Sequence, residues 1–327
     1  LTPPAVKVCA QERGIPVLQP LHFREQADRD ALAAFCPDVL VVAAYGLILP
    51  QAVLDMPRIG PFNVHGSLLP RYRGAAPIQR AIMDGNALTG VTIMRMERGL
   101  DTGPMLAQRA IGIDLADTAA TLYAELAELG GTLMVETLER LTAGKKTSAP
   151  PLLQEHAVSD PTSLVPPTPI AQDETCATYA AKLVKADGFI DWDRPVREIH
   201  ARIRGVTPWP GAQTVFLLPD REPLMTQLQP GTLGSVFAPD APHPAPGTLQ
   251  GLRNGQLAIA CTDALYLLST LKPAAGKPMS GEAFWNGYCR AGHATTPCRA
   301  ISPAVSHATP RTPSQPCGDI HAPEDRV

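Results

Sequence analysis

The segment Val39–Ala44 limits the folds open to this chain more than any other stretch. Its residues are all apolar, so an extended chain there presents apolar side chains to both faces, as a strand inside a covered parallel sheet does. Around it the pattern alternates between strands at 61–65 and 91–96 and helices at 6–13, 26–35, 52–56, 76–83 and 122–133. This order predicts an α/β domain with a largely parallel sheet, in which 39–44 is a central strand.

Prolines indicate where this domain ends. Of the 35 prolines, sixteen fall within 150–169, 239–246 and 297–323, which are typical of a linker, an internal loop and a tail. Beyond the linker, helical patterns at 179–184 and 196–204 precede short strand patterns at 214–218, 256–261 and 265–269. Short strands between Gly and Pro turns predict a small β-rich domain, with a barrel as one possible form. We therefore divide the chain into a first domain (1–147), a Pro-rich linker (148–171), a second domain (172–288) and a disordered tail (289–327).

Composition narrows the class of protein further. The 28 Lys and Arg against 31 Asp and Glu give a net charge of −3, which excludes a histone-like protein and leaves nucleic-acid contact to a local patch. No stretch reaches the roughly 20 apolar residues of a membrane span, and no signal-peptide pattern opens the chain. Scattered cysteines without a C-x-x-C pair are typical of a reduced compartment, and Cys289, His293 and Cys298 lack paired zinc-ligand spacing. We predict a soluble, unsecreted protein without a metal site.

The segment 63–77, NVHGSLLPRYRGAAP, contains the residues best suited to chemistry. It starts at the end of a predicted buried strand, where open α/β sheets place their ligands. Asn63 and His65 are two residues apart, so on a strand they share one face. An amide donor and a titratable imidazole suit a carbonyl that becomes a tetrahedral oxyanion. Asp101, in a glycine-bounded loop after the next strand, could reach the same crevice and orient the histidine.

Other interpretations of these residues stay open at this point. A histidine in a loop at a strand end is often structural, and an aspartate in such a turn often accepts backbone amides. Ser67 is followed by Leu68 rather than by the glycine of a nucleophile elbow, so serine catalysis is disfavoured. The chain also has no dinucleotide-binding glycine motif and no P-loop.

The same residues resemble those of a known family, the methionyl-tRNA formyltransferases. The resemblance covers residues 1 to 288 in order, in both predicted domains. In the first domain it rests on 44–50 (AYGLILP), 63–79, 89–94 (TGVTIM) and 99–103 (GLDTG). In the second it rests on 178–183 (TYAAKL), 190–192 (IDW), 208–212 (PWPGA) and 273–280 (PAAGKPMS).

The resemblance implies a fold, a reaction and a set of site residues. We expect a Rossmann-like formyltransferase domain followed by an OB-like β-barrel that binds tRNA. The family moves the formyl group of 10-formyltetrahydrofolate to the α-amine of methionyl initiator tRNA for translation initiation, without a metal. Asn63, His65 and Asp101 fill the family's catalytic positions. Two segments are expected to border the folate: Ser67, Leu68, Leu69 and Pro70, and Tyr45, Gly46, Leu47 and Ile48. The expected protein is a cytoplasmic monomer.

A transfer RNA substrate requires a basic surface, although separate basic residues are usually only a solvated face. The side chains that we expect to contact the tRNA flank the site or lie near the start of the second domain. They are Arg71, Arg73, Lys182, Lys185, Arg202 and Arg204.

The chain departs from the family at its start, and this keeps other functions open. Leu1 is not an initiator Met, and compared with the family we expect a preceding strand, helix and strand to be missing. Alternatives are another folate-dependent formyltransferase, acting on glycinamide ribonucleotide or a sugar nucleotide, a formyltetrahydrofolate hydrolase, and an inactive remnant that binds RNA or folate. The second-domain motifs favour tRNA among these.

Overall fold

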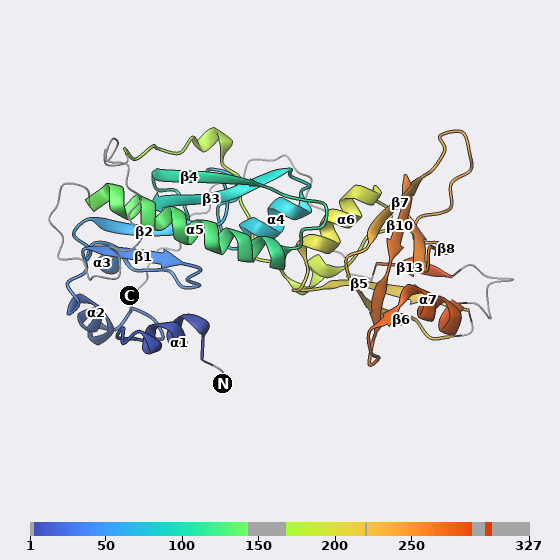
Figure 1. Ribbon diagram of the computed structural model, residues 1–327, viewed down its shortest axis with the longest axis horizontal. Coiled ribbons are helices and arrows are strands. Elements are labelled where there is room, and N and C mark those ends of the chain that lie inside the picture. Colours follow the sequence, from blue (N-terminus) through green and yellow to red (C-terminus); the bar gives the residue numbers. More distant parts are fainter. Residues whose placement is uncertain (1–2, 143–167, 220, 290–297, 303–327) are drawn as a thin grey trace, which may run out of the picture.

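The computed structural model describes residues 3–142, 168–219, 221–289 and 298–302 (Figure 1). The first half contains α1 (Ala5–Glu12), α2 (Gln26–Ala33), β1 (Val39–Ala43), α3 (Gln51–Leu54), β2 (Gly60–His65), α4 (Pro77–Met83), β3 (Leu88–Arg95), β4 (Met105–Gly112) and α5 (Ala119–Thr142). The second half contains η2 (Glu174–Cys176), η3 (Lys185–Gly188), α6 (Val196–Gly205), β5 (Ala212–Leu217), β6 (Leu224–Leu228), β7 (Thr232–Val236), β8 (Leu249–Arg253), β9 (Gln256–Ala260), β10 (Ala264–Leu268), β11 (Thr270–Pro273), β12 (Met279–Ser280), α7 (Gly281–Phe284), η4 (Trp285–Cys289) and β13 (Arg299–Ile301). The helices α4 and α6 pack against each other where the halves meet.

The first sheet has the order β1-β2-β3-β4. β1 and β2 pair in parallel, whereas β2–β3 and β3–β4 are antiparallel. The expected Rossmann-like parallel pairing is therefore present, but it accounts for one of these three strand pairs. The connection 96–104 between β3 and β4 is shorter than the roughly dozen residues that a parallel crossover needs, which explains the last pairing.

The strand β1 does not have the central place that its apolar sequence predicts. Among the described strands it pairs with β2 alone, and its Val41 is 44% exposed. The inner strand is β2, which lies between β1 and β3 and holds Asn63 and His65. The core of this half forms where α4 and α5 pack their apolar faces on the sheet, with Phe62, Ile82, Ile93 and Leu122 almost fully buried.

The second half is β-rich, as predicted, but it does not close into the expected barrel. Its strands form one sheet of order β7-β10-β9-β8 and another of order β12-β11-β6-β5-β13. Among the described residues, a single isolated bridge between Thr248 and Arg299 joins β8 to β13, so no continuous ladder runs around the domain. The sheets enclose a core that includes Trp192, Phe216, Tyr266 and Phe284.

The segment 168–180 lies along the first half of the molecule, and we call it the strap. Ile170 pairs with Met105 at one end of the strap. At its other end the amide of Arg73 donates to the carbonyl of Thr178, and the amide of Ala180 donates to the carbonyl of Arg73. The helix predicted at 179–184 is therefore wrong, because both backbone groups of Ala180 bond to the first domain, the amide to Arg73 and the carbonyl to Ala76. Most of the predicted linker, residues 148–167, lies outside the described residues, as do residues 143–147 at the end of the predicted first domain.

Two further expectations concern the C-terminal tail and membrane-spanning helices. Part of the region predicted as a disordered tail forms β13, which pairs with β5, while 290–297 and 303–327 lie outside the described residues. Within the described part of the chain, no helix is both long enough and apolar enough to cross a membrane.

Candidate active site

Asn63 and His65 lie on the inner strand β2, at the end from which the chain enters the loop 66–76. Both are brought to the crevice predicted for them, and His65 is only 5% exposed. The next helix, α4, begins with Pro77 at its first turn and buries Ile78, Ala81 and Ile82 on one face. The loop is therefore fixed at one end by the sheet and at the other by a packed helix.

Asp101 closes the constellation from the loop 96–104. One carboxylate oxygen accepts a hydrogen bond from the amide of Gly74 at 2.8 Å and lies 3.7 Å from Nδ1 of His65. The other accepts from the side-chain amide of Asn63 at 3.4 Å. Asp101 has φ of 53°, a left-handed conformation that aspartate tolerates better than most residues. The structure thus brings together the three residues that the sequence singled out.

The hydrogen bonds of His65 assign its two ring nitrogens. Nε2 lies 2.9 Å from the carbonyl oxygen of Tyr72, which can only accept, so Nε2 carries a hydrogen in both charge states of the ring. Nδ1 is therefore the nitrogen that gains or loses a proton, and it faces Asp101. A group that exchanges its proton beside a carboxylate and a cavity is suited to general acid–base chemistry.

A cavity of about 850 Å³ opens next to these three residues. Tyr45, Gly46, Leu47 and Ile48 line it, as the resemblance led us to expect. Further lining comes from Gly74–Ala75 and Glu97–Leu100, which overlap motifs quoted for the resemblance, and from the helix α5. The α5 residues at the cavity were not predicted from the sequence. These are Tyr123, Leu126, Ala127, Gly131 and Met134.

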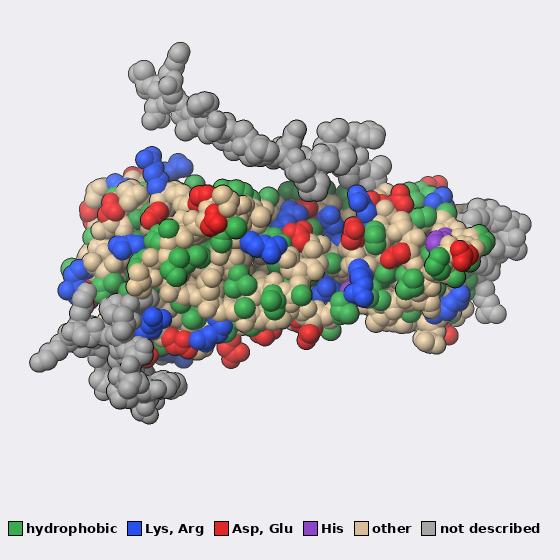
Figure 2. All heavy atoms as spheres, turned by 90° about the horizontal axis from the view of Figure 1, so that it is seen from above, with side chains coloured by type: hydrophobic (Ala, Val, Ile, Leu, Met, Phe, Trp, Pro, Cys, Tyr) green, Lys and Arg blue, Asp and Glu red, His purple; other side chains and the backbone are tan. Residues whose placement is uncertain are grey.

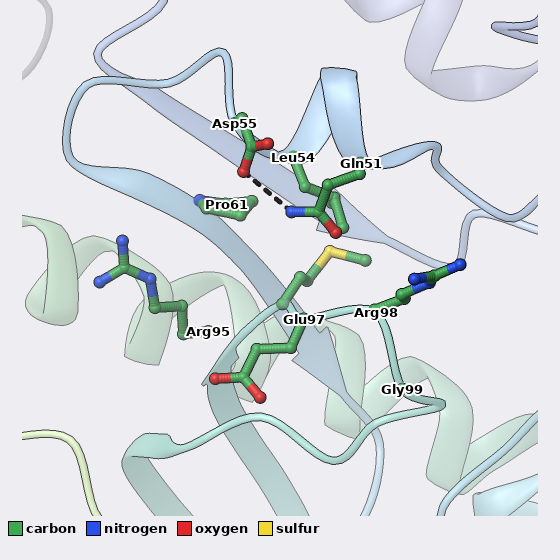
Figure 3. Close-up of a pocket in the computed structure, with 9 residues that line it drawn as sticks. Gln51, Leu54, Asp55, Pro61, Arg95, Glu97, Arg98 and Gly99 are labelled. Carbon is green, nitrogen blue, oxygen red and sulfur yellow. Dashed lines mark hydrogen bonds between the residues drawn. The ribbon is translucent and has the colours of Figure 1, made fainter.

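A polar hollow of about 460 Å³ adjoins the cavity and shares Leu54 and the segment Met96–Gly99 with it. Figure 3 shows its remaining wall, in which the amide of Gln51 donates to Asp55 at 2.8 Å. Its charged side chains, Asp55, Arg95, Glu97 and Arg98, are exposed.

The segment Ser67–Pro70, which the resemblance placed beside the folate, lies outside the lining of the cavity, and its contact with the folate stays a prediction. None of its residues is among the described residues that line the cavity. Ser67 is buried and donates to the carbonyl of Arg71, and Leu69 is 3% exposed with its amide bonded to Thr92. These residues pack toward β3, so they shape the loop from behind rather than forming the cavity wall.

Two of the six arginines and lysines predicted to contact tRNA are buried. The Arg73 side chain is fully buried and makes a two-point ion pair with Glu174 at 2.7 and 2.8 Å. Arg204 is 5% exposed and donates to the carbonyls of Asp114 and Asp117, and burial lowers the pKa of its guanidinium. Neither side chain reaches a phosphate without breaking these contacts, so we withdraw the tRNA prediction for both.

The other four predicted side chains are accessible to different extents. Lys182 and Lys185 are exposed, and Arg71 is exposed with its guanidinium over the ring of Tyr72. Arg202 is 42% exposed and lies 3.8 Å from Asp187, which also pairs with Arg80. On the face seen in Figure 2, basic and acidic side chains are interspersed rather than forming one basic field.

Cysteine and histidine residues do not form a metal site in the described part of the chain, where no group of three or more potential ligands comes together. Cys289 and Cys298 are buried near each other in the second half, and burial raises the pKa of both thiols. His293, the third residue considered, lies outside the described residues.

Comparison with known proteins identifies the family to which the chain belongs. The family model described as "Formyl transferase" matches residues 2–138, and that described as "Formyl transferase, C-terminal domain" matches 182–289. The chain belongs to the formyl transferase family. Within it, a protein of Nitratidesulfovibrio vulgaris (strain DP4) named methionyl-tRNA formyltransferase is 51% identical over 286 residues, which are 88% of this chain and 79% of that protein. The predicted resemblance is thus confirmed.

Solved structures support the fold. HypX from Aquifex aeolicus in complex with tetrahydrofolic acid has a TM-score of 0.52 at 18% identity, over 81% of this chain and 42% of that one. WlaRD, a sugar 3N-formyl transferase crystallised with dTDP and 5-N-formyl-THF, also has a TM-score of 0.52, at 16% identity over 81% of this chain and 80% of that one. At these identities the likeness concerns the fold alone.

Proposed function

We propose that this chain transfers the formyl group of 10-formyltetrahydrofolate to the α-amine of methionine on initiator tRNA. The observation that supports this most is the meeting of Asn63, His65 and Asp101 at the cavity of a chain that shares 51% identity with a methionyl-tRNA formyltransferase. The cavity volume of about 850 Å³ lies within the range of roughly 300–1,000 Å³ typical of small-molecule sites. Tyr45–Ile48 would contact the folate there.

The reaction begins when the neutral α-amine attacks the formyl carbon. A C–N bond forms and the formyl oxygen becomes an oxyanion, which needs hydrogen-bond donors already in place. The side-chain amide of Asn63 and the protonated Nδ1 of His65 are the donors at this site. Because Nε2 is engaged with the Tyr72 carbonyl, the ring cannot turn freely, and Nδ1 stays directed toward the reacting atoms.

Asp101 has two tasks in this scheme. Its carboxylate lies 3.7 Å from Nδ1, longer than a hydrogen bond, so a proton on Nδ1 would remain available to the oxyanion. It also accepts, through water, the proton that the amine loses on attack. When the bond between the formyl carbon and N10 of the folate breaks, its electron pair stays on N10, which takes a proton. The proton lost by the amine is thus matched by the one gained by N10.

The tRNA would lie on both halves of the molecule. Arg71 is beside the site, and Lys182 and Lys185 follow the strap at the entrance to the second half, so all three can reach phosphates near a bound aminoacyl end. Arg202, partly engaged with Asp187, contributes less. We keep the monomer and the cytoplasmic location as predictions.

The experiment that tests this function is a formylation assay with the purified chain, 10-formyltetrahydrofolate and methionyl initiator tRNA. We expect an acid–urea gel to show formylmethionyl-tRNA, and no formate release when tRNA is omitted. Formate release without tRNA, or formylation of glycinamide ribonucleotide or an amino sugar nucleotide in place of the tRNA, would overturn the proposal.

A further inference from the structure

The Asp101 loop, residues 96–104, has a strained fold that needs support. Asp101 itself is in the left-handed region. Gly103 passes so close to the carbonyl of Arg95 that a Cβ atom at position 103 would clash with backbone. A Cβ atom at position 99 would clash with the side chain of Thr102. A loop of this shape presents the Asp101 carboxylate to the site only while its own backbone is held in place.

The strap provides that support through one side chain. The side-chain nitrogen of Gln172 donates to the carbonyl oxygens of both Asp101 and Gly103, each at 2.7 Å. Asp101 and Gly103 flank Thr102, so the side-chain amide of Gln172 bridges the turn that contains Asp101. Gln172 is half-buried and lies two residues after Ile170. The backbone of Ile170 is paired with Met105, the first residue after the Asp101 loop.

A buried arginine fixes the direction of this amide. Nε of Arg73 donates to the side-chain oxygen of Gln172 at 3.0 Å, while its two terminal nitrogens bind Glu174. Because a guanidinium can only donate, the oxygen of Gln172 must face Arg73 and both of its N–H groups must face the loop. Arg73 belongs to the loop 66–76, next to Gly74, whose amide binds Asp101. The strap thus connects both loops that meet at the carboxylate.

We propose that Gln172 is a positioning residue for Asp101: it holds the loop so that the carboxylate faces His65 and Asn63. The inference rests on the proposed function, because it assumes that Asp101 takes part in formyl transfer. Gln172 is not among the described residues that line the cavity, and it bonds the backbone of the Asp101 loop and the Arg73 side chain rather than the side chains of Asn63, His65 or Asp101. We therefore expect its effect on the reaction to come through the position of Asp101.

The test is a double-mutant cycle on formyl transfer with Gln172→Met and Asp101→Asn. Methionine has nearly the length and volume of glutamine but makes none of the three hydrogen bonds. We expect Gln172→Met to lower kcat by about 10- to 100-fold, as a displaced catalytic group does. The KM for tRNA should change little, because a group that matters only in the transition state lowers kcat and kcat/KM together. In the Asp101→Asn background, Gln172→Met should change the rate by less than about twofold, because the group that it positions is already absent.

Controls separate positioning from general damage. Asp173→Ala removes a neighbouring strap side chain whose hydrogen bonds in the described structure go to Thr175 and Cys176, and it should leave kcat unchanged. If Gln172→Met unfolds, Gln172→Glu replaces it, since a carboxylate can still accept from Arg73 but cannot donate to the loop carbonyls. A wild-type kcat in Gln172→Met, or losses that simply multiply with those of Asp101→Asn, would overturn the inference. Inactivity of the wild-type chain itself would instead overturn the proposed function.

Discussion

The site around Asp101 and the basic residues of the second half differ in how their polar atoms are used. His65, Asn63 and Asp101 are largely enclosed and have fixed partners at 2.8–3.7 Å. Lys182 and Lys185 are exposed. Chemistry on a small group requires the first arrangement, because donors must be aimed before the charge develops, whereas a phosphate backbone can be bound by mobile cations. We therefore expect changes in the first region to reduce the rate, and changes in the second to reduce the affinity.

Apart from the loss of His65 or Asp101 themselves, the largest effect that we expect comes from Asn63→Asp. The change keeps the shape of the side chain but replaces the amide donor with a second carboxylate near Asp101. It removes an oxyanion donor and adds repulsion, so kcat should fall by about 10²–10³-fold with little change in tRNA binding. Steady-state kinetics on an acid–urea gel measures the first quantity and filter binding the second. A wild-type kcat would show that Asn63 does not contact the oxyanion.

Two leucines sharpen the comparison within the first half. Leu69 is buried at 3% exposure behind the site loop, and Leu69→Ala should lower the free energy of unfolding by about 2–5 kcal/mol. Leu47 lines the cavity at 49% exposure, and Leu47→Ala should instead raise the KM for the folate by roughly tenfold, since burying a leucine against a ligand is worth about 1.5 kcal/mol. Urea denaturation and folate titration of both variants check this pair. A raised KM for the folate in Leu69→Ala, with a loss of stability in Leu47→Ala, would indicate that residues 67–70 contact the folate.

Lys182→Ala and Lys185→Ala should each weaken tRNA binding modestly, and by a similar factor for tRNAs of different sequence. Loss of one phosphate contact reduces the slope of log K against log salt by about 1. Arg204→Met is the matched control, because it removes a cation from the same half that is buried on backbone carbonyls. It should lower the Tm and leave the salt slope unchanged. A reduced slope in the Arg204 variant would mean that this side chain does reach the RNA.

The smallest expected effect concerns His200, a buried polar group where the halves meet. It bonds the carbonyl of Leu115 at 2.8 Å and the hydroxyl of Tyr266 at 3.2 Å, and desolvation lowers its pKa from the ordinary 6.5. The unfolded chain then binds more protons than the folded one below about pH 6.5, so this residue makes stability fall as the pH falls through that region. Thermal melts from pH 7 to 5 should show a shallower decline of Tm in His200→Gln. An equally steep decline would assign the acid sensitivity to other groups.

Much of the active site could be predicted from the sequence because local rules determine it. Side chains alternate between the two faces of a strand, so Asn63 and His65 share one face. Asp101 lies in the loop after the next strand. The helices at 76–83 and 196–204 were also predictable from their apolar periodicity. These features depend on residues that are neighbours along the chain or on adjacent strands.

The remaining features depend on contacts that are distant in sequence. Whether Arg73 binds RNA or is buried is decided by Glu174, about a hundred residues later, and no local pattern predicts that pair. The strap likewise replaces the helix expected at 179–184 because its backbone finds partners in the first domain. The barrel failed as a prediction for a related reason: strand patterns give the number of strands but not whether the outermost ones meet.

The central claim is that His65 and Asp101 perform formyl transfer, and single-turnover kinetics tests it most directly. His65→Ala and Asp101→Ala would each be mixed in excess over labelled methionyl initiator tRNA with saturating 10-formyltetrahydrofolate, after circular dichroism has shown that both are folded. We predict that each rate falls by about 10²–10⁴-fold. Single-turnover rates near that of the wild type in both variants would contradict the assignment of the active site.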